Sequence, residues 1–99
     1  MEYPVRQLIN DNGNPAAHQF IRRTNKATYF QSYQSVVCKL DGVNIVLSTD
    51  WDYSNTTRKH LYIFFRNNGY YGYSSAKNVR KAIERGEIIL KKVKSLNVT

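Results

Sequence analysis

The sequence predicts an α+β domain, in which a mostly antiparallel sheet of about five strands carries two helices on one face. Short runs of β-branched and aromatic residues, separated by turn residues, fill residues 3–48. After residue 52 the apolar side chains recur at intervals of three and four, which is the spacing of a helix. With 99 residues, 41% of them hydrophobic and 13% aromatic, the whole chain 1–99 suits a single domain with one core.

Three strands are predicted before residue 32. Tyr3, Val5 and Ile9 share one side of the first strand, and the segment "NDNGNP" that follows holds glycine and proline, which end strands. The next two strands are expected at 17–23 and 27–31. The remaining face or one edge of this sheet is expected to stay open for a partner strand or a second copy.

The segment "SVVCKLDGVNIVLS" predicts a β-hairpin. Apolar residues alternate on both sides of Asp41-Gly42, and this dipeptide suits a two-residue turn because both residues tolerate positive φ. The inward-facing positions are predicted to be Val36, Cys38 and Leu40 before the turn, and Val43, Ile45 and Leu47 after it.

The first helix is expected over about 55–66, with Ser54 or Asn55 capping its free amide groups. Its inward positions are Thr57, Leu61, Phe64 and Phe65. Just before it, Trp51 and Tyr53 alternate across Asp52, so they are expected to pack together against the sheet.

The second helix is expected over about 75–85, and Gly86 closes it. Ala76, Val79 and Ile83 are spaced to face inward. The segment "EIILKKVKSL" follows and reads as a C-terminal strand over 88–93.

Catalytic and metal-binding chemistry find little support in the residues. Cys38 alternates with apolar residues and is interpreted as a buried small hydrophobe. His60 follows the cations Arg58 and Lys59 and is interpreted as a surface residue of the first helix. Asp50 and Asp52 form an Asp-x-Asp pair, but negative charge before a helix also favours the helix N-terminus without any metal. We expect no enzyme activity, no metal and no cofactor.

The cationic residues point to a polyanionic partner. The net charge is +8, and residues 74–99 hold seven cations against two anions. Such density is typical of phosphate contact, although an ordinary solvated helix face is the competing interpretation. The predicted contacts are Lys77, Arg80, Lys81, Arg85, Lys91 and Lys92, with Arg58 and Lys59 as a minor extension.

Three tyrosines, Tyr70, Tyr71 and Tyr73, come directly before this basic helix. Aromatic rings beside cations stack unpaired bases, whereas tyrosines in a glycine-bearing loop also fold back on a core or form a protein interface. The three rings are therefore included among the candidate binding residues.

The blocks "YFQSYQSVVCKLDG", "WDYSNTTRKHLYIFF" and "KAIERGEIIL" resemble those of a family of small uncharacterised proteins of phages and bacterial mobile elements. Those proteins typically show a "FQSY" block, a "WDYS-x-TT" block and a closing helix, glycine and strand, and the likeness covers roughly residues 28–90 in the same order. The resemblance implies a setting inside a bacterial cell, and no catalytic residues. A lone cysteine, the lack of a secretion signal and the lack of a long apolar segment agree with the cytoplasm.

The first functional hypothesis is a non-enzymatic accessory protein that binds nucleic acid or a host nucleoprotein complex through the basic C-terminal surface. The second is a counter-defence inhibitor, for example an anti-CRISPR protein, that contacts a host protein through the tyrosine loop. A small metal-dependent enzyme using Asp50, Asp52 and His60 is the third. A membrane partner is not expected, and self-association stays open.

Overall fold

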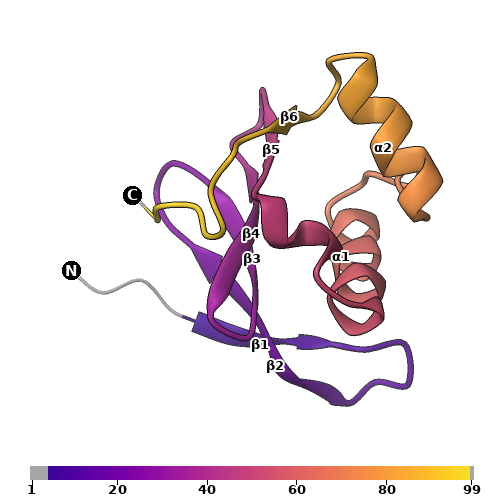
Figure 1. Cartoon of the computed structure of the whole chain (residues 1–99). Coiled ribbons are helices and arrows are strands. Elements are labelled where there is room, and N and C mark those ends of the chain that lie inside the picture. Colours follow the sequence, from indigo (N-terminus) through magenta and orange to yellow (C-terminus); the bar gives the residue numbers. More distant parts are fainter. Residues whose placement is uncertain (1–4, 99) are drawn as a thin grey trace.

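The fold is a single sheet with helices on one side, and it is seen in a computed structural model that describes residues 5–98 (Figure 1). The strands are β1 (Val5–Ile9), β2 (Pro15–Arg23), β3 (Thr28–Ser32), β4 (Ser35–Leu40), β5 (Ile45–Leu47) and β6 (Ile89–Leu90). The helices are the short 3₁₀ turn η1 (Thr49–Asp52), α1 (Asn55–Asn67) and α2 (Ala76–Glu84). The α+β prediction is confirmed.

The strands follow one another across the sheet in chain order, and every neighbouring pair is antiparallel except β5 and β6. Figure 1 shows both helices on one side of the strands and the C-terminal segment on the other. The main core lies under the helices. On the other face, Leu96 packs on a smaller cluster with Tyr29 and Val36, and the Leu96 amide donates to the Val36 carbonyl at 2.8 Å. The second face is therefore only partly open.

A β-bulge in β4 changes which residues face the helices. Phe30 pairs with Cys38, but the next residue Gln31 pairs with Val36, so Val37 is the extra residue. Cys38 belongs to the main core, whereas Val36 lies in the smaller cluster on the opposite face. The prediction that Val36 shares the face of Cys38 is therefore wrong, because alternation fails across a bulge.

The hairpin of β4 and β5 is confirmed, but its turn differs from the prediction. The loop is the four-residue segment 41–44, in which Gly42 has φ of +89°. The carboxylate of Asp41 accepts the amides of Val43 at 2.9 Å and Asn44 at 2.6 Å. Val43 is thus an exposed loop residue and not an inward strand residue, because the aspartate side chain organises a loop that is two residues longer than the predicted turn.

Strand β1 does not bury the side that holds Val5 and Ile9, as their shared apolar character suggests, but the opposite side. Both of these side chains are about half exposed, while Leu8 is fully buried in the main core. Tyr3, which was placed on the same side, lies outside the described residues. Since side chains alternate in a strand, the helix-facing side of β1 is the even-numbered one at Leu8.

Helix α1 begins at its predicted cap and buries the predicted stripe. Ser54 is the N-cap, and its hydroxyl accepts the Thr57 amide at 3.1 Å. His60 is buried as well, with Nδ1 2.7 Å from the Thr56 carbonyl oxygen, so its prediction as a surface residue is wrong. It lies three residues after Thr57 and four before Phe64, and therefore belongs to the same helix face.

Replacing Ser54 by alanine is expected to lower the free energy of unfolding by about 1 kcal/mol, because the Thr57 amide loses its capping oxygen. Ser54 also donates to the Thr57 hydroxyl, which lies 2.9 Å from the Ser32 hydroxyl in the core. Urea denaturation measures the change. The control is Thr56→Ala at an exposed neighbouring position, and an equal loss in both variants would contradict the assignment of the cap.

Before α1, the chain forms a helical turn, so strand alternation does not apply to Trp51 and Tyr53. Trp51 is buried in the main core, but Tyr53 is 75% exposed. The prediction that these two rings pack together is wrong. Thr49–Asp52 adopts the geometry of η1, which turns the two side chains to different sides.

Helix α2 and the last strand agree with the predictions in position but differ in detail. Ser75 caps α2, and Gly86 with φ of +79° follows its end. Val79 and Ala82 are its buried residues, while the predicted inward residues Ala76 and Ile83 are partly buried. Strand β6 has only two residues, because after Leu90 the chain leaves the sheet edge and runs across the sheet.

Within residues 5–98, no helix is long and apolar enough to cross a membrane.

Candidate functional site

A groove of about 400 Å³ runs along the outer side of α1, beside the segment that leads to α2. It brings together five of the predicted binding residues, Arg58, Lys59, Tyr70, Tyr71 and Tyr73. Its remaining lining residues are Asp11, Asn55, Tyr62, Ile63, Arg66 and Ser74. We call this feature the α1 groove.

Tyr62 and Arg66 are groove residues that the sequence analysis missed. Arg58, Tyr62 and Arg66 are spaced by four, so they form one row along the helix surface beside the buried stripe. That spacing is a signal the sequence contains.

The three loop tyrosines play different parts. Tyr70 and Tyr73 fold back on the core, with ring centroids 6.2 Å and 5.2 Å from that of Phe65. The Tyr73 hydroxyl also donates to Glu87 at 3.1 Å. Burial and this bond raise the pKa of Tyr73. Tyr71 is 73% exposed, so it is the ring in this loop that is free to stack on a ligand.

The cations of the α1 groove also differ in their freedom. Arg58 donates to the Asp52 carboxylate at 2.5 Å, and Arg66 pairs with Asp11 on the β1–β2 loop. Lys59 is exposed, and no ion pair among residues 5–98 involves it. Lys59 is therefore the groove cation most available to an anionic ligand.

Asp52 joins the start of α1 to α2. Its two oxygens accept from Arg58 at 2.5 Å and from Arg80 at 2.7 Å, and the Arg80 guanidinium lies 5.6 Å from the centre of the Trp51 ring. Burial raises the pKa of Asp52, but the bonds from Arg80 and Arg58 outweigh it and leave the pKa below its usual value. Arg58 and Arg80, both predicted as binding residues, are thus ion-paired with Asp52 between α1 and α2.

Replacing Asp52 by asparagine is expected to lower the free energy of unfolding by about 1 kcal/mol at neutral pH, because two partly exposed ion pairs are lost. The lowered folded-state pKa means that the carboxylate stabilises the fold above the ordinary carboxyl pKa of about 3.9. That contribution disappears as the pH falls through the folded-state value. Urea denaturation of both proteins measures this, and a difference that persists in acid would contradict the assignment.

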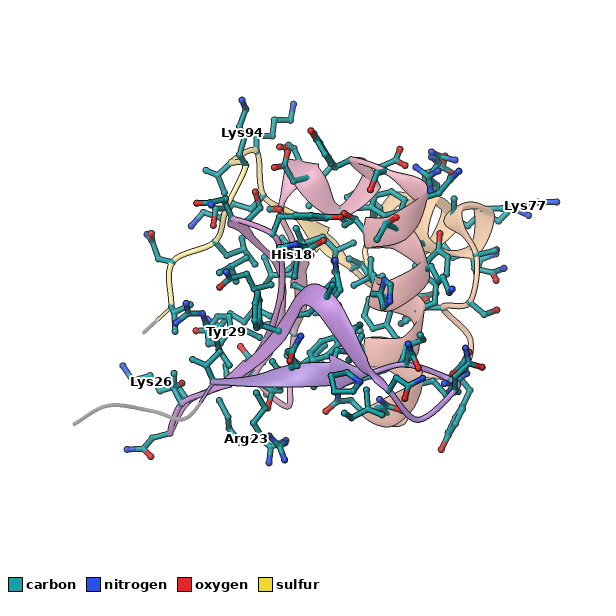
Figure 2. All side chains as sticks on the ribbon, turned by 90° about the horizontal axis from the view of Figure 1, so that it is seen from below. His18, Arg23, Lys26, Tyr29, Lys77 and Lys94 are labelled. Carbon is teal, nitrogen blue, oxygen red and sulfur yellow. The ribbon has the colours of Figure 1, made fainter. Side chains whose placement is uncertain are left out.

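The other predicted cations fall into separate groups. Lys77 and Lys81 are exposed on α2, while Arg85 faces Glu87 at 3.8 Å. Lys91 and Lys92 line a different hollow, together with Lys39 of β4. Figure 2 shows Lys77 well apart from Lys94.

The candidates for catalysis have structural partners. Cys38 is fully buried, as predicted, and burial raises the pKa of its thiol far above the ordinary value. The Asp50 carboxylate accepts a hydrogen bond from the Ser35 hydroxyl at 2.7 Å. The Asp52 carboxylate has different partners, Arg58 and Arg80. Across the described chain, no three His, Cys, Asp or Glu side chains gather in a way that could hold a metal ion.

The chain belongs to a family of unknown function (DUF8033), whose model matches residues 3–84. The match includes the whole of the α1 groove and ends with α2. Neither the curated proteins nor the solved structures gave a match to the chain.

Proposed function

We propose that this member of DUF8033 is a non-enzymatic accessory protein that binds nucleic acid, or a host nucleoprotein complex, through the α1 groove. The observation that supports the proposal is that two tyrosines, one of them exposed, and two cations line a single groove. These residues are Tyr71, Tyr62, Lys59 and Arg66. Rings and cations at close quarters suit an unpaired nucleotide strand, which offers flat bases and phosphates in alternation.

In this arrangement the roles are divided. Tyr71 stacks on a base, and Lys59 attracts a neighbouring phosphate. Tyr70 and Tyr73 anchor the loop on Phe65, so Tyr71 is presented from a fixed segment. Lys77 and Lys81 on α2 add positive charge beyond the loop and favour the approach of a polyanion.

The proposed setting is a bacterial cell that carries a phage or mobile element. Its support is the likeness of the "FQSY" and "WDYS-x-TT" blocks, which lie at the β3–β4 turn and at the start of α1. Ser32 of the first block and Thr57 of the second are joined by their hydroxyls at 2.9 Å. This hydrogen bond gives Ser32 and Thr57 a structural role, and the proposed binding residues are those of the α1 groove.

Fluorescence anisotropy with labelled single-stranded DNA, double-stranded DNA and RNA tests the proposal. We expect the single strands to bind best at low salt, with the logarithm of the affinity falling linearly against the logarithm of salt concentration. The slope reports how many phosphate contacts form. Absence of binding at low salt, or an affinity that does not respond to salt, would contradict the proposal.

A counter-defence inhibitor that acts through protein contact is the second candidate. The observation in its favour is the exposure of Tyr53 and Tyr71, since exposed tyrosines offer contact area at a small entropy cost. Capture of host proteins from a lysate, with and without nuclease treatment, separates the two candidates. A captured protein that survives nuclease and is lost in Tyr71→Ala supports the inhibitor, whereas loss on nuclease treatment supports the first proposal.

A further inference from the structure

Two aromatic residues adopt left-handed backbone conformations at one end of the sheet. His18 in β2 has φ of 62°, and Tyr33 in the β3–β4 turn has φ of 55°. Such values are rare for residues with a side chain, and glycine would adopt them without strain. The Tyr33 amide donates to the His18 carbonyl at 2.7 Å, a bond that glycine at either position could also make. The backbone conformation alone therefore does not explain why aromatic residues, and not glycines, occupy these two positions.

The rings form an exposed shelf. Their centroids lie 5.0 Å apart and their planes differ by 17°, so they are stacked. Tyr33 is 45% exposed and His18 is exposed as well. Because each ring uses only one face in this contact, the outer faces remain for a further flat group.

An arginine is held beside this shelf. Nε of Arg22 donates to the Gln31 side-chain oxygen at 2.6 Å, and Nε2 of Gln31 donates to the Tyr33 carbonyl at 2.8 Å. This chain of bonds fixes the guanidinium relative to the shelf. No ion pair in the described chain involves Arg22, so its two terminal nitrogens are left for an anion.

The shelf and the arginine line a hollow of about 750 Å³ on the sheet face away from the helices. Phe20, Gln31, Gln34, Val36 and Val98 complete the lining, and no described lining residue is acidic. A flat stacking surface, an oriented guanidinium and a lack of negative charge match a base joined to a phosphate. We propose that this hollow binds a nucleotide, with the base on the His18–Tyr33 shelf and the phosphate on Arg22.

This site is separate from the α1 groove. The two hollows share no lining residue. The nucleotide can come as a free molecule or as one unit of a single strand. Both sources offer the same base and phosphate, so the probes must distinguish them.

Calorimetric titration of the full chain with AMP, adenosine, inorganic phosphate and a short oligo(dA) tests the proposal, on the Lys59→Glu background that weakens the α1 groove. We expect AMP or the oligonucleotide to bind more tightly than adenosine or phosphate alone. Binding of AMP alone identifies a free nucleotide, and binding of the oligonucleotide alone identifies a strand. If neither AMP nor the oligonucleotide binds, the proposal for this hollow is wrong. The proposal for the α1 groove is tested separately, by the salt series on the unmodified protein.

Variants of the shelf make the test specific. Tyr33→Gly is expected to weaken binding at least about tenfold while the Tm stays unchanged or rises, because glycine tolerates the backbone angle and loses only the ring. Arg22→Gln is expected to weaken AMP binding to a similar extent, and Tyr33→Phe keeps the ring and is expected to bind normally. Unchanged affinity in both Tyr33→Gly and Arg22→Gln would overturn the proposal.

Discussion

Replacing Phe64 by alanine is expected to lower the free energy of unfolding by about 3–5 kcal/mol. Phe64 is fully buried and stacks on Phe30 of β3 with ring centroids 5.6 Å apart. It also contacts the ring of Phe65 at 6.5 Å, so its removal leaves a cavity where α1 meets the sheet. A domain of this size has a total stability of roughly 5–15 kcal/mol, so the variant approaches the limit of folding.

Urea denaturation followed by circular dichroism measures this loss. Phe64→Leu retains most of the buried apolar volume and is expected to lose less than Phe64→Ala. Tyr53→Ala, at a residue that is 75% exposed, is the surface control and is expected to change the stability little. A Phe64→Ala variant as stable as the Tyr53→Ala control would show that α1 does not pack on β3 as described.

The combined variant Lys59→Glu and Tyr71→Ala is expected to cause the largest loss of nucleic-acid affinity. Stacking on one ring contributes roughly 1–3 kcal/mol per base, and reversing a phosphate-contacting charge adds repulsion. Lys59 and Tyr71 are both exposed, and neither takes part in the ion pairs that hold α1 and α2 together. The loss should therefore appear in affinity, with the Tm near that of the unmodified protein.

The matched control for this variant is Lys26→Glu. Lys26 is an exposed lysine in the turn between β2 and β3, and Figure 2 shows it far from Lys77 on α2. The Lys26→Glu substitution changes the net charge by the same amount as Lys59→Glu. If Lys26→Glu weakens binding as much as Lys59→Glu does, the affinity follows the overall charge and the α1 groove is not the binding site.

Local patterns were sufficient to predict the elements that depend on periodicity and capping. The three-and-four spacing of Leu61 and Phe64 placed α1, and Ser54 capped it as expected. The Asp-Gly dipeptide marked the β4–β5 hairpin, although the loop that the carboxylate of Asp41 organises has four residues in place of two. These signals are local, so a short stretch of sequence contains them.

Features that depend on contacts between distant segments were not predicted. The bulge at Val37 is set by the pairing of β4 with β3, and a single strand does not reveal it. Asp52 binds Arg80, which lies twenty-eight residues later in the chain, and the spacing of neither residue predicts this ion pair. The α1 groove likewise joins Lys59 to the later loop at Tyr71, which becomes visible only in the fold.

Chemical-shift mapping of the amide resonances during titration with a short single-stranded oligonucleotide tests the central claim most directly. The α1 groove predicts that residues 58–74 shift at low salt, with the largest changes at Lys59 and Tyr71, and that added salt reverses them. Unchanged resonances throughout residues 58–74 at saturating oligonucleotide would contradict the assignment of this groove as the nucleic-acid site.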